Sequence, residues 1–133
     1  MLILDTLPIV DFFKTELESI KRIILDAEEG REELGISVVT ISELFYILAH
    51  DKGMDFSRVC IESIKPYLRL IPVNAEIAEK AGELKFVHSG KHIKKGLPLA
   101  DCIIAATALE SAAILVTRDI HFGKIKGLRI QWV

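Results

Sequence analysis

The segment LPLADCIIAATALESAAILVTRD, residues 97–119, holds the pattern that decides the fold. Pro98 opens a predicted helix over 98–111, and the apolar residues that follow indicate that it is buried on most sides. The short apolar run over 113–117 predicts a buried strand. Asp101 lies in the first turn of the predicted helix, and Asp119 lies two residues after the predicted strand. The segment therefore predicts a helix that leads into a buried strand, with an acid at the start of one and after the end of the other.

The rest of the chain repeats this alternation of short apolar runs and amphipathic stretches. We expect strands over 2–4, 36–39, 113–117 and 128–133, a poor strand candidate with a proline over 70–73, and helices over 9–14, 17–28, 40–49, 55–69, 74–87 and 98–111. Strands that alternate with helices are typical of α/β proteins. The order predicts one α/β domain over residues 1–133, with a mainly parallel sheet covered on both faces.

Length and composition limit the classes of protein that fit. The 133 residues are 50% hydrophobic and their mean hydropathy is +0.35, which excludes a disordered chain. A net charge of −2 excludes a nucleic-acid binder that relies on bulk positive charge. The charge is uneven, however, because residues 1–60 hold six basic and twelve acidic residues, whereas residues 61–133 hold eleven and seven. Any polyanion must therefore be bound locally, by a basic patch or through a metal.

The apolar stretch over 97–116 is about as long as the roughly 20 residues of a membrane-spanning helix. It contains two acids, which are costly in hydrocarbon, and the N-terminus reaches Asp5 before the core of a signal peptide could form. We therefore expect a soluble, cytoplasmic protein without a membrane partner. Cys60 and Cys102 lie far apart among apolar residues and are expected to be buried, reduced thiols.

Basic residues are densest between positions 85 and 95. They surround Ser89 and Gly90 and comprise Lys85, His88, Lys91, His92, Lys94 and Lys95. This segment is either a solvated loop between helices or an arm that contacts phosphates without reading bases. Composition leaves both interpretations open.

Four acids follow the ends of predicted strands or begin predicted helices. Asp5 and Asp119 follow strands, and Glu43 and Asp101 lie in the first turns of helices. The ligand crevice of a parallel α/β sheet lies at the carboxyl ends of its strands, so we expect the four to converge there. Clustered carboxylates repel one another unless a cation or a proton compensates, and such hard oxygen ligands suit Mg²⁺ or Mn²⁺.

Three of these acids also have structural explanations. Thr40 and Glu43 fit a T-x-x-E capping box, the helix dipole favours Asp101 in a first turn, and Asp119 begins a turn. Asp5 is the least easily explained in this way, because an acid that closes an apolar strand is poorly placed for solvent.

Four segments resemble the acidic motifs of the PIN-domain family. They are MLILDT at 1–6, SVVTISEL at 37–44, DCIIAATA at 101–108 and VTRD at 116–119, the last followed by Phe122. They occur in the family's order and span nearly the whole chain. In its size, the chain resembles the VapC toxins of toxin–antitoxin pairs, which are PIN-domain ribonucleases.

This resemblance implies a three-layer α/β/α fold with about five parallel strands. It also implies that Asp5, Glu43, Asp101 and Asp119 bind Mg²⁺ or Mn²⁺ and catalyse hydrolysis of RNA, with Asp101 or Asp119 orienting the water. A cognate antitoxin and a homodimer are implied as partners, the latter with a surface from 44–48 and 59–68. The expected substrate contacts are Thr6, Lys91, Lys94, Lys95, Thr117, Arg118 and His121.

Two positions depart from the family pattern. Leu7 stands where the family commonly has Ser or Asn, so either Thr6 takes over that hydrogen bonding or metal binding is weakened. His121 stands where many relatives have a further acid, and it is a metal ligand, a phosphate contact or a surface substitution. These departures favour the alternative of a PIN module without catalysis that binds RNA or a protein; an RNA-processing nuclease is another alternative. A phospho-accepting receiver domain fits less well, because no acid adjoins Asp5.

Overall fold

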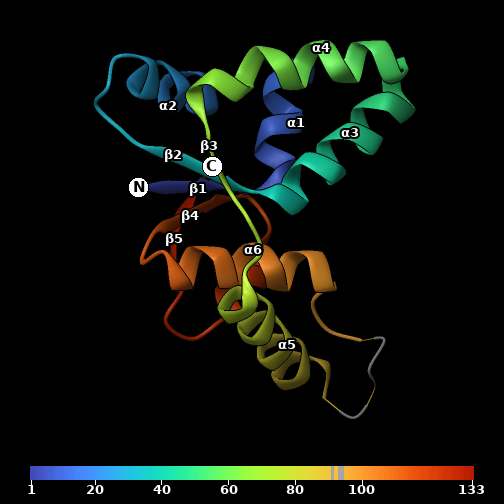
Figure 1. Cartoon of the computed structure of the whole chain (residues 1–133), viewed down its shortest axis with the longest axis vertical. Coiled ribbons are helices and arrows are strands. Elements are labelled where there is room, and N and C mark those ends of the chain that lie inside the picture. The colour runs from blue at the N-terminus through green and yellow to red at the C-terminus, as the bar shows by residue number, and fades with distance from the viewer. Residues whose placement is uncertain (91, 93–94) are drawn as a thin grey trace.

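The centre of the fold is a parallel sheet (Figure 1). A computed structural model describes residues 1–90, 92 and 95–133, and within these ranges the sheet has five strands in the order β3-β2-β1-β4-β5. They are β1 (Leu2–Leu4), β2 (Leu34–Ser37), β3 (Arg69–Ile71), β4 (Ile114–Thr117) and β5 (Arg129–Trp132). All neighbouring pairs are parallel, which confirms the prediction. The chain builds outward from β1 in one direction and then from β4 in the other, so the switch point where such sheets bind ligands lies between these two strands.

Helices cover both faces of this sheet. Figure 1 shows α1 (Thr6–Thr15), α2 (Glu18–Glu28), α3 (Val38–Lys52) and α4 (Met54–Ile64) on one side, and α5 (Ala75–Ser89) and α6 (Leu99–Glu110) on the other. The buried apolar residues form two clusters, one with Ile9, Ile20 and Leu44 and the other with Ile104 and Phe122. The expected three-layer α/β/α architecture is therefore present. In the part of the chain that the structure describes, no helix has the length and apolar character needed to cross a membrane.

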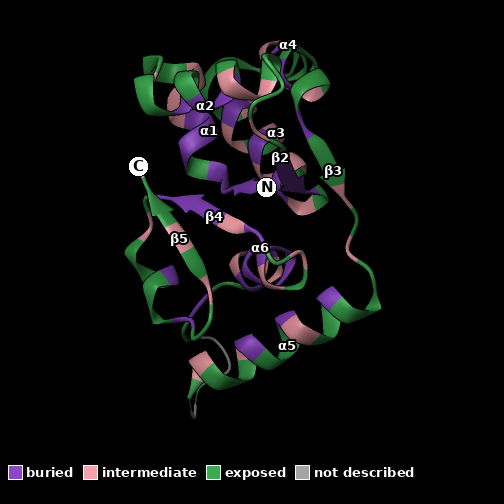
Figure 2. Cartoon of the chain, turned by 90° about the vertical axis from the view of Figure 1, so that its left-hand side faces the viewer, coloured by how far each residue is buried: buried purple, intermediate pink, exposed green. Residues whose placement is uncertain are grey.

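Burial follows the position of each strand in the sheet (Figure 2). All three residues of β1 are buried, because this strand has a neighbour on each side and helices on both faces. The edge strands β3 and β5 are largely exposed. The continuous apolar run over 2–4 therefore marks the centre of the sheet. Cys60 and Cys102 are buried and free, as expected.

The boundary between β2 and α3 differs from the prediction. The strand ends at Ser37, not at residue 39, and α3 begins at once, because the Ser37 side chain accepts a hydrogen bond from the Val39 backbone N–H at 3.3 Å. Ser37 is thus the helix cap, and the predicted capping box of Thr40 and Glu43 is wrong. Thr40 is buried within the helix, and Glu43 lies in the second turn, not the first.

Other boundaries shift by local effects of the same kind. The helix predicted from residue 9 already begins at Thr6, because Asp5 caps it. The helix predicted over 55–69 ends as α4 at Ile64 and continues as a short 3₁₀ helix, Lys65–Tyr67, since Pro66 lacks the N–H of an α-helical hydrogen bond. The poor strand candidate near Pro72 is the edge strand β3, which ends before the proline.

Candidate functional site

The four acids meet at the switch point of the sheet. Asp5 directly follows β1, and Asp119 follows β4, its parallel neighbour. Glu43 approaches from α3, and Asp101 approaches from the first turn of α6. Their proximity is evident at Asp101, whose pKa rises to about 7 because of burial and then the charges of the other three acids. The predicted convergence of these residues is therefore present.

Asp5 lies deepest in this acidic centre, the name used here for Asp5, Glu43, Asp101 and Asp119. Its side chain is buried, with 4% exposure, and each carboxylate oxygen accepts a hydrogen bond. Oδ1 accepts from the Thr6 backbone N–H at 2.7 Å, and Oδ2 accepts from the Thr117 hydroxyl at 2.7 Å. Burial raises the pKa of Asp5, the Thr117 and Thr6 hydrogen bonds oppose this rise, and the charges of Glu43 and Asp119 add to it.

Two threonine hydroxyls hold the acidic centre together. The Thr6 hydroxyl donates to Glu43 Oε1 at 2.7 Å, and the Thr117 hydroxyl, besides donating to Asp5, accepts from the Asp119 backbone N–H at 3.0 Å. Both threonines are buried. The sequence predicted them as substrate contacts, but in this structure their hydroxyls are used by the acids. They supply hydrogen bonds of the kind that Leu7, itself exposed, lacks.

The surroundings of Asp119 lower its pKa, whereas those of Asp101 raise its pKa. Its Oδ1 accepts from the His121 backbone N–H at 2.9 Å and lies 2.7 Å from His121 Nδ1. Burial acts to raise the pKa of Asp119, but the hydrogen bonds from His121 and the charges of His121 and Arg118 lower it below its ordinary value. The centre therefore contains one acid that stays ionised and one that is poised near neutral pH.

Arg118 forms an ion pair that no pattern in the sequence predicts. Its Nε lies 2.7 Å from Oδ2 of Asp11, on α1, and a second guanidinium nitrogen lies 3.3 Å from Oδ1. Asp11 and Arg118 are 107 positions apart, and no local pattern singles out Asp11. The predicted substrate contact at Arg118 is thus occupied by an internal partner.

The basic segment divides into a structural part and an exposed part. The Lys85 ammonium donates to the carbonyl oxygens of Leu97 at 2.7 Å and Lys95 at 3.2 Å, and so holds residues 95–97 against α5. Lys95 itself is exposed. Lys91 and Lys94, both predicted as phosphate contacts, lie outside the described residues.

The chemistry of the acidic centre suits a hard divalent cation. Its donors are carboxylate oxygens, and burial together with the charges of neighbouring acids raises the pKa values of Asp5 and Asp101, so a bound cation would stabilise their ionised forms. Among residues 1–90, 92 and 95–133, no group of three or more His, Cys, Asp or Glu side chains is arranged so that it could hold a metal ion as it stands. Uncompensated carboxylates repel one another, so a cation would draw these side chains inward.

Together these features define an α/β/α domain with a carboxylate cluster at the switch point of a parallel sheet. A sequence model of the PIN domain matches residues 2–128, and the chain belongs to the PIN-domain family. Among curated proteins, no match is found.

Solved structures share this fold over nearly the whole chain. VapBC2 of Rickettsia felis, bound to a DNA fragment of its promoter, has 23% identity and a TM-score of 0.82, with 98% of this chain and 97% of that chain covered. The corresponding values are 23%, 0.80, 98% and 96% for DNA-bound VapBC of Salmonella typhimurium. They are 15%, 0.70, 92% and 93% for VapC20 of Mycobacterium tuberculosis, a toxin that cleaves the sarcin–ricin loop. At these identities the similarity concerns the fold.

The pKa of Asp101 predicts a pH-dependent gain in stability for Asp101→Asn. Its folded pKa of about 7 lies above the ordinary value of 3.8, so the folded state holds the proton more tightly, and stability is lost as the pH rises from about 4 through 7. Removing this charge should stabilise the metal-free protein at pH 8 by on the order of 1–3 kcal/mol, after allowance for solvent screening, and much less at pH 5. Urea unfolding in EDTA at both pH values measures the difference.

The matched control for this experiment is Glu110→Gln, at the exposed end of the same helix. It removes the same charge without touching the acidic centre, so its effect should be small and similar at both pH values. A gain for Asp101→Asn that is equal at pH 5 and pH 8 would contradict the electrostatic explanation.

Thr117→Val should destabilise the fold by about 1–3 kcal/mol, because it leaves a buried carboxylate oxygen of Asp5 without its donor. Thr107→Val is the matched control: this threonine is also buried, but its hydroxyl only donates to the Ile103 carbonyl one turn earlier in α6. Its cost should stay below about 1 kcal/mol. Denaturant unfolding compares the two variants, and equal losses would show that the bond to Asp5 has no special importance.

Proposed function

We propose that the protein is a metal-dependent ribonuclease that hydrolyses RNA phosphodiester bonds. The observation that carries this proposal is the convergence of Asp5, Glu43, Asp101 and Asp119 at the switch point, with the pKa of Asp101 raised to about 7. Membership of the PIN-domain family supports it. The similar fold of a toxin that cleaves the sarcin–ricin loop supports RNA as the substrate.

The four acids would hold Mg²⁺ or Mn²⁺, with different roles set by their environments. The bound metal supplies positive charge that stabilises negative charge developing on the phosphate. Asp119, with its lowered pKa, stays ionised over the physiological range and suits permanent ligation. Asp101, in the first turn of α6, would orient the attacking water through its carboxylate as well as bind the metal.

The threonines act on the acids, not on the substrate. By donating to Asp5 and Glu43, the hydroxyls of Thr117 and Thr6 fix the carboxylate orientations before any cation arrives. Fixed ligands lower the reorganisation that binding requires. This arrangement offsets the loss of a polar residue at Leu7.

We further propose that the nuclease is the toxin of a toxin–antitoxin pair, with an antitoxin protein as its partner and a homodimer as its assembly. The similar solved structures of VapBC complexes support this role. An RNA-processing nuclease would use the same site without an antitoxin. A small neighbouring gene that encodes a DNA-binding N-terminal segment would distinguish the toxin from the processing enzyme.

Asp101→Asn should abolish metal-dependent RNA cleavage, with a loss of at least about a hundredfold, because it removes both a charged metal ligand and the carboxylate that orients the water. The measurement is cleavage of a panel of single-stranded and structured RNAs in Mn²⁺ or Mg²⁺. Glu110→Gln should cleave like the wild type. Equal cleavage by wild type and Asp101→Asn would contradict the proposed site, and no cleavage by either would favour the inactive module.

Millimolar Mn²⁺ should raise the melting temperature of the wild type by roughly 5–10 °C when it is in about hundredfold excess over its dissociation constant. Asp5→Asn should show a smaller rise, because the most buried carboxylate of the centre loses its charge. Glu110→Gln controls for nonspecific binding to surface acids. A wild type whose melting temperature ignores the metal would argue against a metal centre.

A further inference from the structure

A cavity lies beside the acidic centre, next to the end of α5. It has a volume of about 280 Å³ and is lined by His88, Gly96, Leu97, His121 and Lys124. His88 belongs to the last turn of α5, and His121 and Lys124 belong to the short 3₁₀ helix Ile120–Lys124 that follows β4. We call it the basic pocket, because its ionisable side chains are two histidines and a lysine.

Two backbone segments, the one at Gly96 and the end of α5, lie very close together at the basic pocket. Gly96 has φ +81°, and a Cβ at this position would lie 2.1 Å from the His88 carbonyl oxygen. Only glycine allows the segment before α6 to pass so closely over the end of α5. The Lys85 ammonium also holds this segment against α5, by donating to the carbonyl oxygens of Leu97 and Lys95. The wall of the pocket is therefore held in place without a ligand.

Charge distinguishes this pocket from its neighbour. Among the described residues, none of those that line the pocket is acidic, and Lys124 makes no ion pair with an acid. His121 belongs to both sites, since it lines the pocket and bonds to Asp119 Oδ1 at 2.7 Å. The carboxylates of the metal-free acidic centre repel a polyanion. The pocket beside them, separated only by the His121 side chain, offers the positive charge of Lys124 instead.

We propose that the basic pocket binds a backbone phosphate of RNA adjacent to the phosphodiester placed at the acidic centre. Lys124 supplies the charge, and His88 supplies a ring N–H group at the pocket wall. The inference rests on the proposed ribonuclease function and adds to it a second phosphate position, which fixes the register of the strand without reading bases. The short 3₁₀ helix Ile120–Lys124 directly follows Asp119, so it sets the distance between the phosphate at the acidic centre and the phosphate in the basic pocket.

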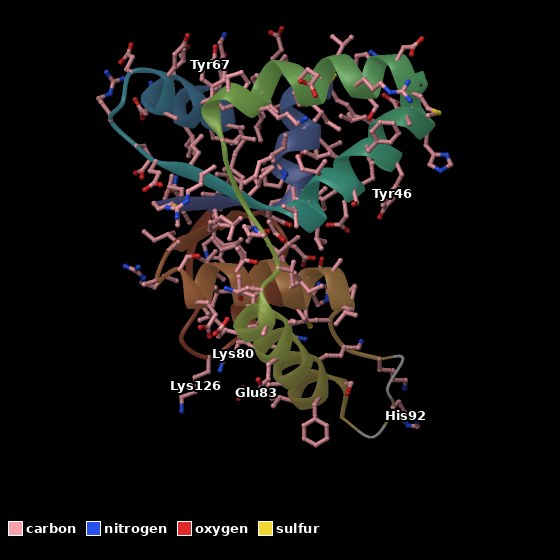
Figure 3. The ribbon with its side chains drawn as sticks, viewed as in Figure 1. Tyr46, Tyr67, Lys80, Glu83, His92 and Lys126 are labelled. Atoms are coloured by element: carbon pink, nitrogen blue, oxygen red, sulfur yellow. The ribbon has the colours of Figure 1, made fainter. Side chains whose placement is uncertain are left out.

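The first test compares Lys124→Ala with Lys126→Ala in the Asp101→Asn protein, which should bind RNA in Mg²⁺ without cutting it. Lys126 is exposed, does not line the pocket and projects outward from the molecule (Figure 3). Lys124→Ala should weaken RNA binding roughly fivefold or more at 0.1 M salt and reduce the salt dependence by about one phosphate contact. Lys126→Ala should do neither; equal losses in both variants would overturn the pocket.

Cleavage by the otherwise wild-type enzyme separates positioning from chemistry. Lys124→Ala should raise KM for RNA and leave kcat largely intact, since the lost contact lies outside the acidic centre. A fall in kcat with unchanged KM would overturn the proposal. If no RNA is cut by any variant but binding still depends on Lys124, the proposed function fails and the pocket stands.

Inorganic phosphate provides a test that needs no RNA. The ring-proton NMR signals of His88 and His121 should shift saturably with phosphate at constant pH in the wild type and Lys126→Ala, and not in Lys124→Ala. Identical shifts in all three proteins would overturn the pocket. An acidic peptide whose binding depends on Lys124, together with RNA binding that does not, would assign the pocket to a protein partner and overturn the proposal.

Discussion

The hydrogen bond from the Thr117 hydroxyl to Asp5 Oδ2 joins the end of β4 to the end of β1 across 112 positions of the chain. It is the contact on which the acidic centre depends, because it compensates part of the cost of burying a carboxylate between two central strands. An unpaired buried charge at this point would cost several kcal/mol or force protonation. With the bond in place, Asp5 caps α1, and Thr6 reaches Glu43.

The acidic centre and the basic pocket are neighbouring sites of opposite chemical character. The acidic centre collects carboxylates from both halves of the sequence, whereas the basic pocket draws only on its C-terminal half. His121 lies between them and bonds to Asp119. A protein with a net charge near zero can thus hold an acidic and a basic site side by side, which bulk composition does not reveal.

Much of the fold follows from local pattern, and the errors have local causes. The apolar runs that became β1 and β4 lie at the centre of the sheet, where both faces are buried, so their composition is distinctive. The spacing of Thr40 and Glu43 is that of a capping box, but the strand ends at Ser37, two residues before the predicted end, and Ser37 caps the helix. Because α3 starts there, Glu43 lies in its second turn, where the side chain accepts a hydrogen bond from Thr6, 37 positions away in the chain.

The sequence by itself determined the alternation of helices and strands and the parallel sheet, and it predicted that four acids meet at one edge of that sheet, because apolar runs, helical spacing and short motifs are local features of the chain. Only the tertiary structure decided which hydroxyls hold the acids, that Arg118 is paired with Asp11, and that His88 and Lys124 share a cavity. It also decided that the pKa of Asp101 rises while that of Asp119 falls. The physical reason is that pairing and titration depend on distances through space and on burial, and the residues concerned are brought together only when the strands align.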